Sequence, residues 1–335
     1  MTQSAIDTDE VSGTVPEGEP EGDRTRYVRT FVLLFSSACL IWVLRPLIAN
    51  GRELAASVEG GHLLGRTAAG ALAYAALSVL NALAWWWLAG LYGCRPTLRR
   101  GYEVFARSQV AKYLPGNIFH YVSRQLLGRR AGLSHTALVA SSILEMASML
   151  TAAAALILLA SGTTYLPDHD HHLVWLASTG GILVLVFGWR VMDTGLRRFG
   201  PTAPWFQGLP RLRFGDAARL FGPTLVFHIS FAVGVGGILW ALVSVIAPET
   251  AQPSFLRVVG IFPLAWMAGT VTLGAPAGVG VREAVLTWQL GTLLTPAQAA
   301  ATALALRLVT LSGDLLTALA GWLQAPRPPV SGPAS

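Results

Sequence analysis

The chain has 335 residues, of which 53% are hydrophobic and only 13% are charged, and its formal net charge is +6. Soluble globular proteins carry roughly 25% charged residues, so this composition excludes an ordinary water-soluble fold. The basic residues lie in short loops between apolar runs, where membrane topology accounts for them, so the net charge does not indicate nucleic-acid binding.

The chain divides into three expected regions. Residues 1–29 begin with an acidic stretch that nearly lacks large apolar side chains, which predicts a disordered cytoplasmic tail. Residues 30–323 form the expected transmembrane domain, because runs of about 18 or more apolar residues indicate bilayer spans. Residues 324–335 are a short Pro-rich tail.

The apolar runs predict an all-α polytopic bundle with about six or seven spans and two broken or re-entrant helices. A shorter apolar run covers 281–294, and broken segments at 102–129 and 257–294 interrupt the series. The longer runs lie at 30–49, 67–92, 136–161, 172–191, 218–247, 257–274 and 297–323.

Basic-rich and basic-poor loops alternate along the chain. Segments 93–130 and 190–219 are rich in Arg, whereas loop 162–171 holds no Lys or Arg. The positive-inside rule then places the N-terminus in the cytoplasm. We expect the chain in the cell (inner) membrane. Segment 257–274 is either a full span or half of a hairpin that enters and leaves on the outer side. We favour the hairpin, which would put the C-terminus inside.

Two segments have a similar broken construction. Each has a Pro with Gly close behind, then a short helical stretch with an Arg, a hydroxyl-capped turn and a long span with an ionisable group. These features are Pro115-Gly116, Arg124, Ser134 and Glu145 in the first segment, and Pro276, Gly278, Gly280, Arg282, Thr295 and Arg307 in the second. Interrupted helices at corresponding places in two halves are typical of transporter binding sites, and inverted repeats are the hypothesis that follows.

The breaks predict an anion site. Pro removes a backbone donor and Gly allows a sharp turn, so one half-helix ends and another begins inside the protein. A helix start with free N–H groups attracts phosphate or carboxylate, and Lys112, Arg124 and Arg282 would add full charges. The candidate headgroup-binding residues are Lys112, Tyr113, Pro115, Gly116, Asn117, His120, Arg124, Gly278, Gly280 and Arg282. The equally open alternative is that 102–129 is an amphipathic helix pair lying on the membrane surface.

Four further charged residues are expected within the membrane, namely Glu145, Glu283, Arg307 and Asp314. Charges at that depth are costly and usually face the bundle interior. Glu145 could pair with Arg124 or Arg282 or carry a coupling proton, and a purely structural ion pair is equally open. The cluster of Asp and His at 168–172 has no rigid ligand spacing, so we expect a solvated loop, no metal site and no cofactor.

The segments KYLPGNIFHYVSR at 112–124 and GAPAGVGVREAVL at 274–286 resemble the two signature segments of the lysylphosphatidylglycerol synthase transmembrane region. This is the flippase-like membrane domain of multiple peptide resistance factors. The second segment departs from the family at one position, since Ala277 stands where the family usually has Gly. The resemblance implies movement of lipid between leaflets, of aminoacylated phosphatidylglycerol in the best-understood members. Those members carry a soluble aminoacyltransferase domain, and this chain ends at Ser335 without one, so we expect no synthase activity.

The expected function is flippase or scramblase movement of an anionic lipid such as a phospholipid, an aminoacyl-phospholipid or a polyprenyl-phosphate-linked lipid. The alternative is a membrane-embedded transferase or an accessory subunit of a glycosyltransferase or other lipid-modifying complex. We expect a transporter and not an enzyme, because the sequence shows neither an aminoacyltransferase domain nor a nucleotide-binding motif. The expected partners are membrane lipids and a lipid-modifying enzyme or glycosyltransferase, with no nucleic acid.

Overall fold

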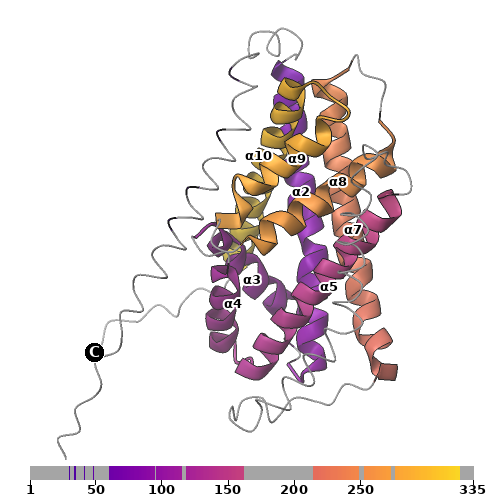
Figure 1. Ribbon diagram of the computed structural model, residues 1–335. Helices are drawn as coiled ribbons and strands as arrows, with labels where there is room; N and C mark the ends of the chain where they lie inside the picture. Colours follow the sequence, from indigo (N-terminus) through magenta and orange to yellow (C-terminus); the bar gives the residue numbers. More distant parts are fainter. Residues whose placement is uncertain are drawn as a thin grey trace, which may run out of the picture.

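The computed structural model describes residues 60–94, 96–114, 118–161, 214–248, 253–272 and 276–324, together with the single positions 30, 34, 41 and 48. Regular structure in this part of the chain is helical throughout (Figure 1), which confirms the all-α prediction. The expected spans at 30–49 and 172–191, the loop at 168–172 and the two expected tails fall almost wholly outside these residues.

The long helices match the apolar runs of the sequence. Within the described residues, four helices are long and apolar enough to cross a membrane. They are α2 (Gly60–Leu91), α5 (His135–Ser161), α7 (Phe214–Ile246) and α10 (Pro296–Gln324). Helix α2 begins earlier than the predicted run at 67–92. The predicted run starts after Arg66 because a charged residue ends an apolar run. A helix can continue past such a residue, so hydropathy does not mark its first turn.

The remaining helices form two pairs, and a short 3₁₀ helix lies between the two helices of each. These are called the two broken pairs. The first consists of α3 (Leu98–Ser108), the 3₁₀ helix η1 (Gln109–Tyr113) and α4 (Phe119–Arg130). The second consists of α8 (Phe255–Val271), the 3₁₀ helix η4 (Pro276–Gly278) and α9 (Val281–Leu290).

Both helices of the second pair are shorter than a bilayer span. At 1.5 Å per residue, the 17 residues of α8 extend about 26 Å, which is less than the ~30 Å hydrocarbon core. Helix α9 has only 10 residues, and it packs against α8. This geometry favours the hairpin over the full span for segment 257–274.

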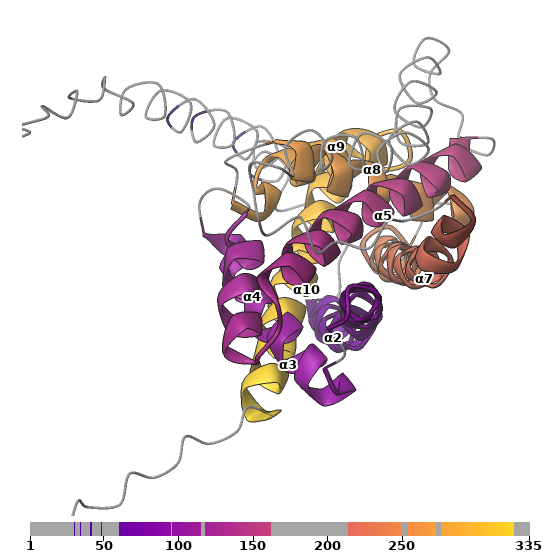
Figure 2. The ribbon, with the colours of Figure 1, turned by 90° about the horizontal axis from the view of Figure 1, so that it is seen from below.

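Helix α2 lies between α7 and α10 and packs against both (Figures 1 and 2). Helix α5 packs against α7 and α8, which closes the bundle on the α7 side. The main core joins these helices through fully buried aliphatic side chains, including Val235, Leu239, Val258, Leu290 and Leu306.

The two helix breaks meet inside the bundle. Element η1 contacts both η4 and α10, so the two 3₁₀ helices lie together although they are far apart in the sequence. Figure 1 shows α3 and α4 in the lower half of the bundle and α8 and α9 in the upper half. This is the arrangement expected of hairpins that enter from opposite sides, and the membrane sides themselves stay a prediction.

Close packing of α5 on α8 requires Gly260. A Cβ atom at position 260 would overlap the Cβ of Ala160, whereas a Cβ at Gly237 in α7 would meet nothing closer than 3.7 Å. We expect Gly260→Ala to lower the free energy of unfolding by about 1–3 kcal/mol, as overpacking does. The matched control Gly237→Ala should leave the thermal unfolding midpoint unchanged or raised, because Ala is the better helix former. Equal midpoints for the two variants, measured in detergent by intrinsic fluorescence, would contradict this packing.

Candidate functional site

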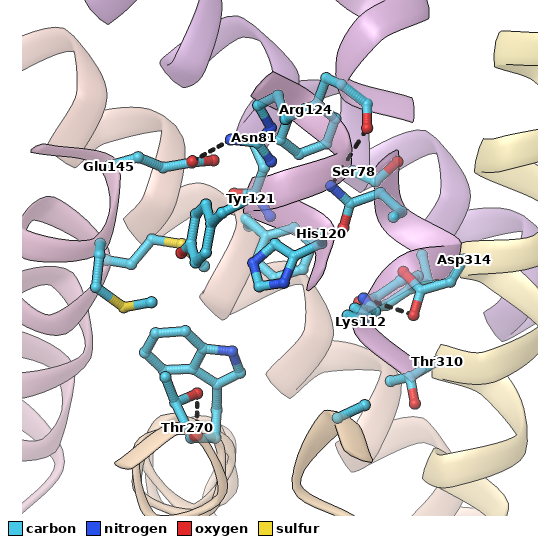
Figure 3. Close-up of a pocket in the computed structure, with 18 of the residues that line it drawn as sticks. Ser78, Asn81, Lys112, His120, Tyr121, Arg124, Glu145, Thr270, Thr310 and Asp314 are labelled. Carbon is cyan, nitrogen blue, oxygen red and sulfur yellow. Dashed lines mark hydrogen bonds and ion pairs between the residues drawn. The ribbon is translucent and has the colours of Figure 1, made fainter. Parts of the chain in front are cut away.

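A cavity of about 190 Å³ lies where the two broken pairs meet α2, α5 and α10 (Figure 3). Its wall is mainly apolar on the side of α5, α7 and α8, where Glu145 and Thr270 are the polar exceptions. The apolar side chains there are Met146, Met149, Phe231, Phe262 and Trp266. The opposite side is polar and charged, with Ser78, Asn81, Gln109, Lys112, His120, Arg124, Arg282, Thr310 and Asp314. The cavity is therefore amphipathic.

Arg124 of α4 is buried, with 1% of its surface exposed, and forms an ion pair with Glu145 of α5. Its guanidinium carbon lies 4.6 Å from the ring centre of Phe105, 5.2 Å from that of Trp85 and 5.6 Å from that of Tyr121. A guanidinium group is well suited to such stacking, because it is planar and weakly hydrated. Burial and pairing show that Arg124 is not a surface cation that anchors 102–129 to lipid.

Lys112 of η1 reaches across to α10. Its Nζ lies 2.6 Å from Oδ2 of Asp314, and the Tyr113 hydroxyl donates to the same oxygen at 2.6 Å. The first broken pair is thus bonded to the last long helix by a lysine and a tyrosine that are adjacent in sequence.

Arg307 lies on the same face of α10 as Asp314, two turns earlier, and it pairs with the second broken segment. Its Nε lies 3.5 Å from Oε1 of Glu283, and its Nη1 donates to the Ala277 carbonyl at 3.2 Å. The other carboxylate oxygen of Glu283 accepts from the Gly280 N–H at 2.6 Å. The expected free N–H at the start of α9 is therefore capped by its own Glu283, as in a capping box, and the backbone of Gly280 does not offer this donor to a headgroup.

The turn before α9 holds an unusual backbone. Ala277 has φ 48°, and it is the one non-Gly residue with positive φ in the described part of the chain. An L-residue other than Gly pays about 1–2 kcal/mol for this conformation. The departure from Gly that the sequence shows at this position is therefore accommodated at a cost, and the turn keeps its shape.

Arg282 differs from the other three cations. Its Nη2 donates to Thr270 Oγ1 at 3.4 Å, and its buried Nε has no hydrogen-bond partner among the described residues. A Cβ at Gly269 would lie 2.8 Å from this Nε, and one at Gly278, which has φ +70°, would lie 2.9 Å from it. The side chain is held between two glycines, with no carboxylate of the described residues paired to it.

The charges around the cavity leave one positive charge uncompensated. Glu145 neutralises Arg124, Asp314 neutralises Lys112, and Glu283 neutralises Arg307, whereas Arg282 has no acidic partner in the described residues. A buried charge without a partner is costly, so the arrangement favours an anion beside Arg282.

The structure brings most of the sequence-predicted site residues together. Lys112, His120, Arg124, Arg282, Glu145 and Asp314 line the cavity, and Tyr113, Gly278, Gly280, Glu283 and Arg307 lie directly behind its wall through the contacts given above. Pro115, Gly116 and Asn117 lie outside the described residues. The predicted pairing of Glu145 with Arg124, one of its alternatives, is confirmed. The hydroxyl caps are also confirmed, since Ser134 accepts from Ala137 N and Thr295 from Gln298 N.

Three wall residues of α2 were not anticipated from the sequence. Tyr74, Ser78 and Asn81 face the cavity from inside a run that reads as a plain apolar span. Their spacing of four and three residues puts them on one helix face, which is the signal that could have revealed them. Polar side chains that share one face of a membrane helix usually face the bundle interior.

Fold and site together define a polytopic helical membrane protein with a charged cavity between two broken helices. The chain belongs to the family described as the lysylphosphatidylglycerol synthase TM region, whose match covers residues 26–318. This confirms the resemblance and gives the protein a membrane, lipid-related role. No curated protein matches the chain.

We expect the buried ion pair of Arg124 and Glu145 to matter for the free energy of unfolding. We expect Arg124→Leu to lower the free energy of unfolding by about 3–5 kcal/mol, because Glu145 is left as an unpaired buried charge. The double variant Arg124→Leu/Glu145→Leu should recover most of that loss. Arg130→Leu on the exposed end of α4 is the matched control and should change little. Additive losses in the double variant, measured by unfolding in detergent, would contradict the pairing.

Proposed function

We propose that the protein moves an anionic lipid between the two leaflets of the membrane, as a flippase or scramblase, without changing the lipid chemically. The headgroup would enter the cavity at the helix breaks, and its phosphate would lie beside Arg282. The acyl chains would stay in the hydrocarbon of the bilayer.

The uncompensated charge of Arg282 is the observation that carries this proposal. An arginine presents donors in a fixed fork that matches a phosphate or carboxylate, and such charge-assisted hydrogen bonds are stronger than neutral ones. The Nε of Arg282 is buried and unsatisfied, and the side chain lines the cavity. An anionic headgroup beside Arg282 would compensate this charge.

The size and polarity of the cavity support a lipid headgroup. A cavity of about 190 Å³ has room for roughly six water molecules at ~30 Å³ each. The apolar wall from α5, α7 and α8 would contact the first carbons of the lipid tails, while the polar wall from α2, η1 and α10 would contact the headgroup. A purely aqueous solute would gain nothing from the apolar wall.

The ion pairs that join both broken pairs to α10 offer a way for the cavity to open to one side of the membrane and then to the other. Element η1 is joined to α10 by the pair Lys112–Asp314, and α9 is joined to α10 by the pair Arg307–Glu283. Ion pairs of this kind have discrete alternative arrangements, which a two-state transporter requires. We propose that these pairs exchange partners as the headgroup passes.

The test is a comparison of Arg282→Gln with Arg129→Gln in proteoliposomes that contain fluorescent phosphatidylglycerol. Dithionite bleaches only the outer-leaflet label, so the rate of further bleaching reports translocation. Loss of a charge-assisted contact should slow Arg282→Gln by at least about tenfold. Arg129→Gln, on the exposed face of α4, should behave as wild type.

Arg282→Lys would keep the charge without the fork, and we expect an intermediate rate. Wild-type rates in Arg282→Gln, with unfolding midpoints equal to wild type, would overturn the proposal. A labelled product formed from lipid donors by the purified protein would favour the transferase alternative instead.

A further inference from the structure

His228 is a buried imidazole in α7 that the proposed lipid movement does not use. Its side chain is 3% exposed, and its Nε2 has no hydrogen-bond partner among the described residues. The other ring nitrogen, Nδ1, lies 2.9 Å from Oγ of Ser148 in α5. A buried polar atom without a partner is costly, so Nε2 needs a partner from outside these residues.

The hydrogen bonds of Ser148 determine which nitrogen of His228 carries the proton. The Ser148 hydroxyl donates its single proton to the Glu145 carbonyl at 3.0 Å, one turn earlier in α5. It therefore meets Nδ1 of His228 as an acceptor, and Nδ1 carries the ring proton. In a neutral imidazole the other nitrogen is then an acceptor. Nε2 is thus a buried acceptor that requires a donor.

A second buried acceptor faces the same space. Asn81 of α2 is 8% exposed, and its Oδ1 also has no partner among the described residues. Asn81 and His228 both line a small cavity of about 20 Å³ between α2, α5, α7 and α8, and the other side chains of its wall are apolar or aromatic. The larger cavity shares Asn81 with this one, but His228 does not line it. Two acceptors therefore share one small space that is distinct from the candidate headgroup site.

The size of the small cavity selects water as the donor. Its volume of about 20 Å³ exceeds the ~10–15 Å³ that one ordered water needs and is below the ~30 Å³ that a water occupies in the liquid, so it holds one molecule. A water molecule has two O–H donors, one for each acceptor. A headgroup ammonium brings carbon atoms with it and would meet no acidic side chain in this wall, which disfavours a cation at membrane depth.

We infer that this cavity is a binding site for one internal water molecule, which donates one proton to Nε2 of His228 and the other to Oδ1 of Asn81. The water joins α2 to α7, and Ser148 extends the link to α5. It therefore connects the polar wall of the larger cavity, on α2, to the apolar wall on α5 and α7. The inference goes beyond the proposed function and does not depend on it, because the water site stands whether or not the protein moves lipid.

The test is solid-state NMR of the full chain in phosphatidylcholine liposomes, with isotopically labelled histidine and magnetisation transferred from water. The chain has seven histidines, so His228→Phe identifies the His228 signals by their loss. In the wild type, Nδ1 should be protonated, Nε2 should be unprotonated, and the ring should receive magnetisation from bound water. A protonated Nε2, or a His228 ring that receives nothing from water, would overturn the inference.

A variant of Asn81 tests the other end of the bridge. Asn81→Leu removes one acceptor, so the transfer from water to His228 should fall about twofold or more, since an ordered water needs at least two polar partners. Met149→Leu is the matched control, because it replaces a wall side chain with one of similar volume and keeps both acceptors. Its transfer should equal that of the wild type.

Equal transfer in Asn81→Leu and the wild type would show that Asn81 does not hold the water, and the bridge between α2 and α7 would be wrong. Unchanged signals of His62 and His135 show that a variant is folded. If Asn81→Leu fails this control, the tautomer and the water transfer of the wild type still decide the inference. Loss of lipid movement in Arg282→Gln bears on the proposed function alone.

Discussion

A charge in a low-dielectric interior must be paired, and this constraint organises the whole centre of the molecule. Desolvating an ion costs several kcal/mol, so a buried cation is stable only beside an anion with good geometry. Helix α10 supplies the oppositely charged partner for both broken pairs. Asp314 holds Lys112 of the first, and Arg307 holds Glu283 of the second. One face of a single long helix therefore fixes the two interrupted segments against each other.

The same constraint explains why the interrupted backbone can exist there. Unsatisfied peptide groups are not tolerated against lipid, and irregular backbone at membrane depth needs protein or water around it. Elements η1 and η4 cover one another and lie against the bundle. The N–H of Gly280 is taken by Glu283, and the carbonyl of Ala277 is taken by Arg307. The break is thus closed by side chains that are themselves part of the ion-pair system.

Much of the fold follows from local sequence, whereas the pairing of charges does not. Apolar runs locate α5, α7 and α10, because length and hydropathy are properties of one segment. Pro and Gly locate both breaks for the same reason. The choice of Glu145 as the partner of Arg124, or of Glu283 as that of Arg307, depends on tertiary packing. The cap on α9 was readable in principle, since Glu283 follows Gly280 by three residues, as capping boxes require.

Lys112 is the sole lysine of the chain, so it is also the sole ε-amine. Its Nζ lies at the cavity wall in the ion pair with Asp314. Amine-directed acylation can therefore modify one side chain only, apart from the α-amino group of the chain. The extent of that reaction from each side of the bilayer becomes a direct readout of which face the cavity is open to, without any engineered label.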